Sequence, residues 1–269
     1  MKYLELSRFG RITAAAALLL LASVSSNTAF GQESDGLLKI KNKTQAFHVA
    51  ALEQVESGDF KLSLKNESDK YITAFRVSVH NAQTSGPIDV DVVCCNRGIA
   101  PGAVHPIHFG ARAAEGSDQT PRVVIEAVVF DDRTSDGDAA VAAEIEAVRF
   151  AEKLQLTRII DMIGETLASP DADTQAAIDK FKLDVSALPV DSGVSEALAT
   201  MRLEVRLPDD ADGELSRGVR SGLRNGKERL RQSLFQLERE NETSGGVATT
   251  PRDTLTQIRE EYKRIVERL

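Results

Sequence analysis

Residues 60–81 read FKLSLKNESDKYITAFRVSVHN, and their pattern decides the fold class of the first half of the chain. Apolar and polar residues alternate in two runs, with apolar members Phe60, Leu62 and Leu64, then Phe75, Val77 and Val79. Because successive side chains of a strand point to opposite faces, each run predicts a strand with one apolar face. The polar segment Asn66–Asp69 between the runs predicts a turn. This stretch therefore indicates two strands joined by a turn.

The same signals extend outward from this stretch. IDVDVVC (88–94) alternates again, and RVVIEAVVF (122–130) is apolar on both sides, as a central strand would be. Further turn chemistry occurs at Glu56–Asp59, Ser85–Pro87, Ala100–Gly102 and Glu115–Asp118. Short strands separated by turns about every ten residues are typical of an antiparallel sandwich. We expect a β-sandwich over residues 32–135.

The stretches FKLSLKNESDKYITAFRVSVHN, IAPGAVHPIHF and VVIEAVVFDD together resemble immunoglobulin-like or fibronectin-III-like accessory domains of bacterial exported proteins. The resemblance lies in a strand ending in Asn-x-Ser, a polar turn, an Ile-led strand and a Pro-Gly turn. It covers about a third of the chain. It implies a fold rather than an activity, with structural turn roles for Asn66, Ser68, Pro101 and Gly102.

After FDDRTSDGD (130–138) the period of the apolar residues changes to that of amphipathic helices. Three helices are expected between residue 138 and Pro208, with breaks at Ser169–Asp171 and Pro189. Two more are expected in GELSRGVRSGLRNGKERLRQSLFQLEREN (213–241) and TPRDTLTQIREEYKRIVERL (250–269). We therefore expect an α+β protein in which residues 136–269 form a helical bundle-like region of about five helices.

The N-terminus has the pattern of a secretory signal peptide over residues 1–31. Lys2, Arg8 and Arg11 precede an apolar run, Ala14–Val24, and a small-x-small pattern ends at Gly31. The alternative is a short N-terminal anchor that is kept, although the run is too short to span a bilayer. We expect export to the periplasm or the extracellular space.

Charge and composition exclude some functions. Removing residues 1–31 takes away three basic residues and one acidic residue, so the formal charge moves from −8 to −10. An acidic chain is a poor general nucleic-acid binder, because binding needs clustered Lys and Arg. No later segment is apolar for long enough to cross a membrane. The absence of Trp argues against a sugar-binding platform.

Four soft side chains within residues 90–109 are candidate metal or redox residues: Cys94, Cys95, His105 and His108. Cys and His are the usual zinc ligands. However, successive side chains of a strand point to opposite faces, so Cys94 and Cys95 would face opposite sides. His105 and His108, three residues apart, would also face opposite sides. A disulfide between the adjacent cysteines would require a turn. We expect Cys94 to be a small core residue and Cys95 a partly exposed thiol, and keep the metal or thiol site as an alternative.

The acidic segment FDDRTSDGD suggests calcium but fails the EF-hand template, because Thr134 and Ala143 stand where acids are needed. We expect an Asx turn, a positive φ at Gly137 and an N-cap at Asp138 instead.

The helix at 213–241 carries a stripe of cations at spacings of three and four, here called the basic stripe: Arg217, Arg220, Arg224, Lys227 and Arg231. Such a stripe could meet an anionic surface or an acidic partner, or form a solvated face paired with the chain's own acids. Gly218, Gly222 and Gly226 lie four apart beside it. Three interior glycines destabilise a helix, so they predict the close approach of a neighbouring helix or strand.

No nucleophile-elbow, zinc-protease or dinucleotide-binding motif occurs, and no cofactor is expected. We therefore expect a non-catalytic, envelope-associated binding or scaffold module that acts on another envelope protein or an anionic surface. The expected binding surfaces are the basic stripe and the rim near Cys95 and His108. Two alternatives stay open: a metal- or thiol-dependent protein using Cys94, Cys95, His105 and His108, and a hydrolase without a recognisable motif.

Overall fold

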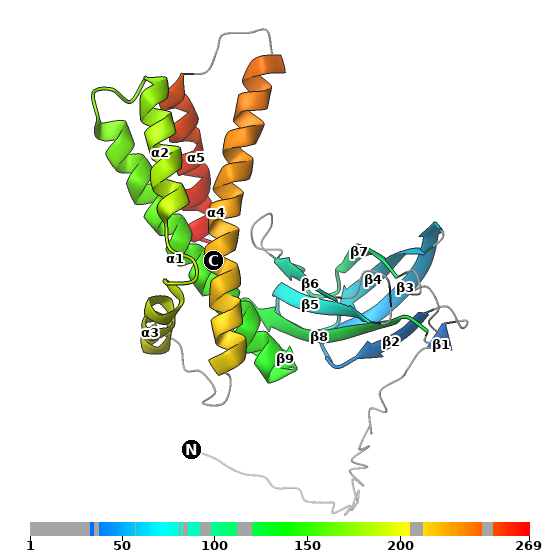
Figure 1. Ribbon diagram of the computed structural model, residues 1–269. Coiled ribbons are helices and arrows are strands. Elements are labelled where there is room, and N and C mark those ends of the chain that lie inside the picture. Colours follow the sequence, from blue (N-terminus) through cyan, green and yellow to red (C-terminus); the bar gives the residue numbers. More distant parts are fainter. Residues whose placement is uncertain are drawn as a thin grey trace, which may run out of the picture. The chain divides into compact units, whose positions relative to one another are not determined.

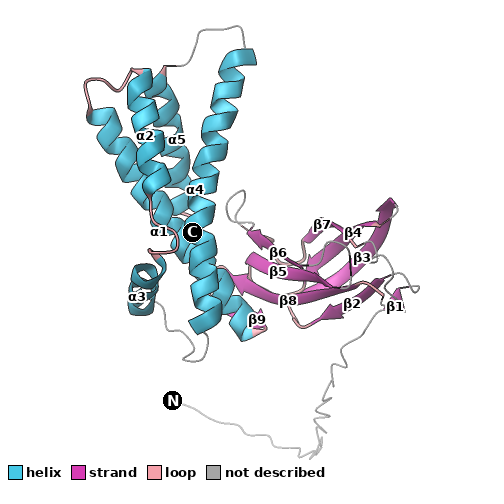
Figure 2. Cartoon of the chain, viewed as in Figure 1, coloured by secondary structure: helices cyan, strands magenta, loops and turns pink. Residues whose placement is uncertain are grey.

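The structure, a computed structural model, describes residues 33–34, 38–56, 58–80, 82, 86–91, 98–111, 120–204, 212–243 and 250–269. Strands come first in these ranges and helices follow (Figures 1 and 2). The strands are β1 (Glu33–Ser34), β2 (Leu38–Asn42), β3 (Phe47–Glu56), β4 (Asp59–Asn66), β5 (Ile72–His80), β6 (Gly86–Asp91), β7 (Val104–Gly110), β8 (Arg122–Phe130) and β9 (Ser135–Gly137). The helices are α1 (Ala139–Ala168), α2 (Gln175–Ala187), α3 (Val194–Glu204), α4 (Asp212–Thr243) and α5 (Pro251–Val266). The expected mixed α+β class is confirmed. The expected signal peptide (residues 1–31) falls outside the described residues.

The strands form two sheets. One has the order β1-β2-β8-β5-β6, with β9 also paired to β8, and the other has the order β3-β4-β7. All the pairs are antiparallel except β2 with β8, which run parallel. Both sheets contribute to one apolar core, in which the rings of Phe47 and Phe75 meet edge to face at 5.1 Å. The alternating residues of the opening stretch, from Phe60 to Val79, are buried there as expected.

The strand β8 is central, between β2 and β5, and it is buried on both faces. One face belongs to the core between the sheets. The other packs on α1, where Ala127 and Val129 join Ala142 and Ile145 in a separate apolar cluster. This second layer also explains why β5, which includes the polar Arg76, is buried along most of its length.

The Asn-x-Ser turn after β4 is held by the side chain of Asn66. Its amide donates to the carbonyl oxygens of Lys70 at 2.8 Å and Ile99 at 2.9 Å, and its oxygen accepts from the Ser68 amide at 3.0 Å. The amide of Gly102, with φ +74°, donates to the Asn66 carbonyl at 2.8 Å. The side chain is fully buried, so these bonds replace the water that it loses.

The prediction of a turn at Ser85–Pro87 is wrong in part. Gly86 begins β6, and Pro87 pairs with Ser78 of β5. Because β6 is an edge strand of its sheet, a proline there removes no hydrogen bond from a second neighbour.

Side-chain N-caps precede α1 and α5. The Asp138 carboxylate accepts from the amides of Ala140 at 3.2 Å and Val141 at 3.4 Å, and Gly137 has φ +99°. The expected positive φ and N-cap are confirmed, and so is the Asx turn, in which the Thr134 amide donates to the Asp132 carboxylate at 3.0 Å. Thr250 caps α5 in the same way, through the Asp253 amide at 3.1 Å.

The helices pack around α1. One apolar cluster joins α1 with α2, α4 and α5, and another joins α1 with α3 and α4. None of the helices in the described ranges combines the length and apolar composition needed to cross a bilayer.

The three glycines of α4 lie directly against α1. A Cβ added at Gly218 would lie 2.6 Å from the Glu144 carbonyl oxygen, and one at Gly226 would lie 2.9 Å from Gln155 Cβ. At Gly222 it would overlap the Val148 carbonyl oxygen. The expected close neighbour is confirmed, and it is a helix.

Candidate functional site

The region 90–109 does not bring its candidate ligands together where it is described. Cys94 and Cys95 lie outside the described residues. His105 and His108 both lie on β7, and they face opposite sides of the strand. His105 is half-buried with its ring 5.8 Å from that of Phe75, and burial lowers its pKa, whereas His108 is exposed. Within the described ranges, no three His, Cys, Asp or Glu residues are grouped so that they could hold a metal ion.

Three aspartates of residues 130–138 make structural contacts within the protein: Asp132, Asp136 and Asp138. Asp132 lies 2.8 Å from Lys70 Nζ, and this lysine, with help from Thr134, lowers the pKa of Asp132 to about 2. Asp136 accepts from the backbone amides of Gln45 at 2.6 Å and Ala46 at 2.8 Å. Together with the cap at Asp138, these contacts account for the segment as a structural corner.

The basic stripe lies on α4 as expected, but several of its members are paired within the protein. Arg217 lies 3.3 Å from Glu214 and 3.6 Å from Glu144. Arg220 lies 2.8 Å from Asp191, and Arg231 lies 2.6 Å from Glu228. Apart from the Glu144 carboxylate, which is buried, the groups in these pairs are largely exposed, so the pairs contribute little to stability.

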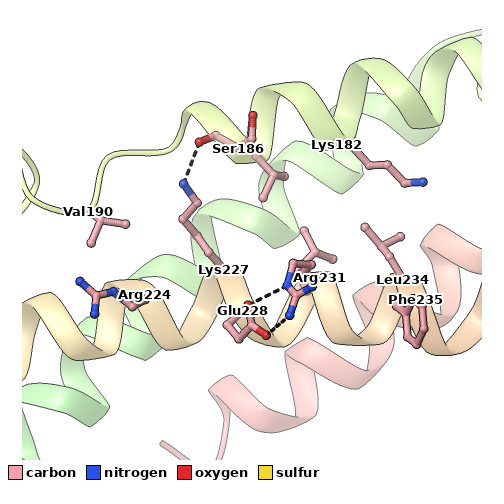
Figure 3. Close-up of a pocket in the computed structure, with 11 residues that line it drawn as sticks. Lys182, Ser186, Val190, Arg224, Lys227, Glu228, Arg231, Leu234 and Phe235 are labelled. Atoms are coloured by element: carbon pink, nitrogen blue, oxygen red, sulfur yellow. Dashed lines mark hydrogen bonds and ion pairs between the residues drawn. The ribbon is translucent and has the colours of Figure 1, made fainter.

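Lys227 has a different kind of partner. Its ammonium donates to the backbone carbonyl oxygen of Ser186 at 2.7 Å (Figure 3) and to that of Leu188 at 3.0 Å. The last carbonyls of a helix have no partners within the helix and carry partial negative charge. Lys227 therefore stabilises the C-terminal end of α2 and ties it to α4.

Arg224 is the member of the stripe that remains available. It is exposed and makes no hydrogen bond or ion pair within the described part of the chain. It lines the same pocket as Val190 (Figure 3).

A groove of about 580 Å³ runs between α2 and α4, here called the α2–α4 groove. It lies where residues 182–190 pass residues 224–235 (Figure 3). Its apolar lining is Val185, Val190, Leu230, Leu234 and Phe235. Its polar lining is Lys182, Ser186, Arg224, Lys227, Glu228 and Arg231. The stripe thus meets an apolar surface at its C-terminal half, whereas Arg217 and Arg220 lie outside the groove.

The charge of the groove is opposite to that of the chain. Four cations and one carboxylate line it, although the whole chain carries a formal charge of −8. A smaller cavity of about 240 Å³ between α1 and α2 has no such surplus, because Lys180 there pairs with Asp184 and Glu165 adds another acid.

Comparison of the chain with protein-family models, curated proteins and solved structures finds no match. The candidate site is therefore defined by its own geometry: an apolar groove between two helices with cations along its edges.

Proposed function

We propose that this chain is a non-catalytic binding module that holds an amphiphilic anionic ligand in the α2–α4 groove. The observation that carries the proposal is the combination of five apolar side chains with four cations in an otherwise acidic chain. Ligand sites are mostly apolar, with a few polar groups that fix orientation. The apolar lining provides affinity, and Arg224, which has no hydrogen bond or ion pair within the described part of the chain, orients the anionic end of the ligand.

The lining of the groove supports binding rather than catalysis. Glu228 is the one carboxylate among the lining residues, and the hydrogen bond from Arg231 lowers its pKa. A general acid or base works best with a pKa near the operating pH, whereas this carboxylate stays ionised.

The wider proposal is an exported, envelope-associated protein. The signal-peptide pattern of residues 1–31 supports export. We also propose an immunoglobulin-like class for the two sheets, supported by their shared core and the Asn66 turn. In this view the sheets support α1, and α1 in turn supports the helices of the groove.

An anionic dye tests the proposed function. The probe is 8-anilinonaphthalene-1-sulfonate, which combines an aromatic body with a sulfonate. We expect one saturable site per chain, weakened about tenfold or more by Phe235→Asp and several-fold by Arg224→Glu. The matched controls are Leu183→Asp, which changes an exposed apolar residue of α2 outside the groove, and Arg122→Glu, on the sheet.

The controls should leave dye binding unchanged. Absence of a saturable site, or equal binding by the Phe235→Asp variant, would overturn the proposed function.

A further inference from the structure

Building on the proposed function, we infer that the α2–α4 groove binds one helix of a partner protein. This helix is amphipathic over about three turns and carries Asp or Glu on both sides of its apolar face. The inference rests on the length, openness and charge of the groove.

The length of the groove suits a short helix. Its α4 wall extends from Arg224 to Phe235, which at 1.5 Å per residue is about 16 Å, or three helical turns. Leu230, Leu234 and Phe235 follow one another along this wall. A helix that binds in such a groove inserts anchors at i, i+3 or i+4, and i+7, which span about 10 Å and so fit within the length of the wall.

The openness of the groove favours a helix over a single acyl chain. Phe235 lines the groove while 64% of its surface stays exposed. Sites for small ligands usually bury about 70–90% of the ligand surface, which an open groove does not do. A helix needs to bury only its apolar face, and an exposed aromatic ring at the edge is a typical interface anchor.

The depth of the groove argues against a flat membrane surface. Leu230 and Leu234 are 1% and 8% exposed and belong to the helical core, so they form the floor of a hollow that a flat bilayer surface does not fill. A convex helix fits such a hollow.

Cations stand on both walls. Lys182 belongs to α2, and Arg224 and Arg231 belong to α4 (Figure 3). A helix lying between the walls meets Lys182 on one side of its apolar face and Arg224 on the other, whereas Arg231 is already paired with Glu228. Charge complementarity therefore requires acidic residues on both flanks of the partner helix.

The chain itself offers no suitable helix in its described part. The apolar face of α5, formed by Leu255, Ile258, Tyr262 and Ile265, is already buried in the bundle. The N-terminal residues 1–31 carry three basic residues and one acid, so their charge has the same sign as that of the groove. The occupant is accordingly a different protein.

The test uses a labelled peptide of about 18 residues, long enough to form a helix, with leucines at helical spacing and glutamates on both flanks. Fluorescence anisotropy measures its binding to the full chain, and circular dichroism measures its helix content. One control peptide has every glutamate replaced by lysine. Another has the same composition in shuffled order. Sodium dodecanoate and vesicles of phosphatidylglycerol are tested in parallel.

We expect the acidic peptide to bind at one per chain and to gain helix, and neither control peptide to bind. Phe235→Asp should weaken binding about tenfold or more, and Arg224→Glu several-fold. Leu183→Asp and Arg122→Glu should change it by less than about twofold.

The outcomes separate the two proposals. If dodecanoate or the vesicles bind in a Phe235-dependent manner and the peptide does not, the helix inference is wrong and the groove remains a site for amphiphilic anions. If no probe binds, or if Phe235→Asp changes nothing, both proposals are wrong.

Discussion

The ammonium of Lys227, on α4, lies 3.0 Å from the carbonyl oxygen of Leu188, the C-cap residue of α2. This bond, with a second one to Ser186, fastens the end of α2 to α4 beside the groove. Lys227 thus has a structural role in a stripe whose spacing suggests a single binding surface. Arg224, one turn earlier, has no such partner in the described part of the chain and can contact a ligand.

Lys227 and Arg224 should therefore respond differently to neutral substitution. Lys227→Met removes two hydrogen bonds to helix-end carbonyls and should lower the free energy of unfolding by about 1 kcal/mol. Arg224→Gln should change it by less than about 0.5 kcal/mol while weakening ligand binding. Urea unfolding of both variants measures the difference, and equal stabilities would contradict the structural role of Lys227.

The glycines of α4 give a prediction with an internal control. Gly222→Ala places a methyl group against the Val148 carbonyl, and α4 can relieve the overlap only by moving away from α1. We expect a loss of about 2 kcal/mol or more, the usual range for overpacking.

Gly213, in the first turn of α4, has open space where an alanine methyl group would lie, with no described neighbour within 4 Å. Gly213→Ala should therefore stabilise the protein by up to about 0.5–1 kcal/mol through helix propensity alone. Thermal unfolding of the Gly222→Ala and Gly213→Ala variants measures both changes in stability. The prediction fails if the two changes have the same sign.

A buried ion pair joins the sheet to α1. Arg76 of β5 donates to Glu144, and their side chains are only 8% and 9% exposed. Arg76→Met leaves a buried carboxylate without its main partner and should cost about 3 kcal/mol. Arg76→Met combined with Glu144→Met should cost less than the sum of the single changes by at least about 1 kcal/mol. Additive effects in urea unfolding would show that the pair does not couple the layers.

Burial raises the pKa of the Tyr262 phenol, whose hydroxyl donates to Ser233 Oγ at 3.2 Å. The folded chain keeps this proton above pH ~10, the ordinary value at which the unfolded chain releases it. The contribution of Tyr262 to the free energy of unfolding is therefore complete below pH ~10 and is lost as the pH rises further. Tyr262→Phe should show a weaker loss of stability between pH ~10 and ~11 in urea unfolding. An identical pH dependence in both proteins would contradict the prediction.

The sequence predicted the elements better than their partners. Alternation at Phe60–Leu64 and Phe75–Val79 was sufficient for β4 and β5, because one face of each strand meets the core. The strand β9 was missed, since Ser135–Gly137 has loop composition and forms a strand only by pairing with β8. The glycines of α4 predicted a close neighbour, but no local pattern says that this neighbour is Glu144–Gln155 of α1.

The candidate site was only half visible in the sequence. The basic stripe is a local pattern, so its residues could be found. The groove depends on residues 182–190 lying beside residues 224–235, and this pairing results from the packing of α2 and α4 on α1. The exposed phenylalanine at 235, one residue after a core leucine, was the local sign of an incomplete surface.

The most direct test of the groove as the ligand site uses the absence of tryptophan from the chain. The variant Phe235→Trp carries a single tryptophan at the edge of the groove, and a second variant, Val104→Trp, carries one at an exposed position of β7, in the sheets. Both are titrated with the anilinonaphthalene dye, whose absorption overlaps tryptophan emission. If the ligand lies in the groove, the Phe235→Trp variant shows strong saturable quenching that is complete at one dye per chain and is reduced by adding Arg224→Glu. The Val104→Trp variant then shows clearly weaker quenching. Equal or absent quenching in the two variants while dye binds would place the ligand elsewhere and contradict the groove as the site.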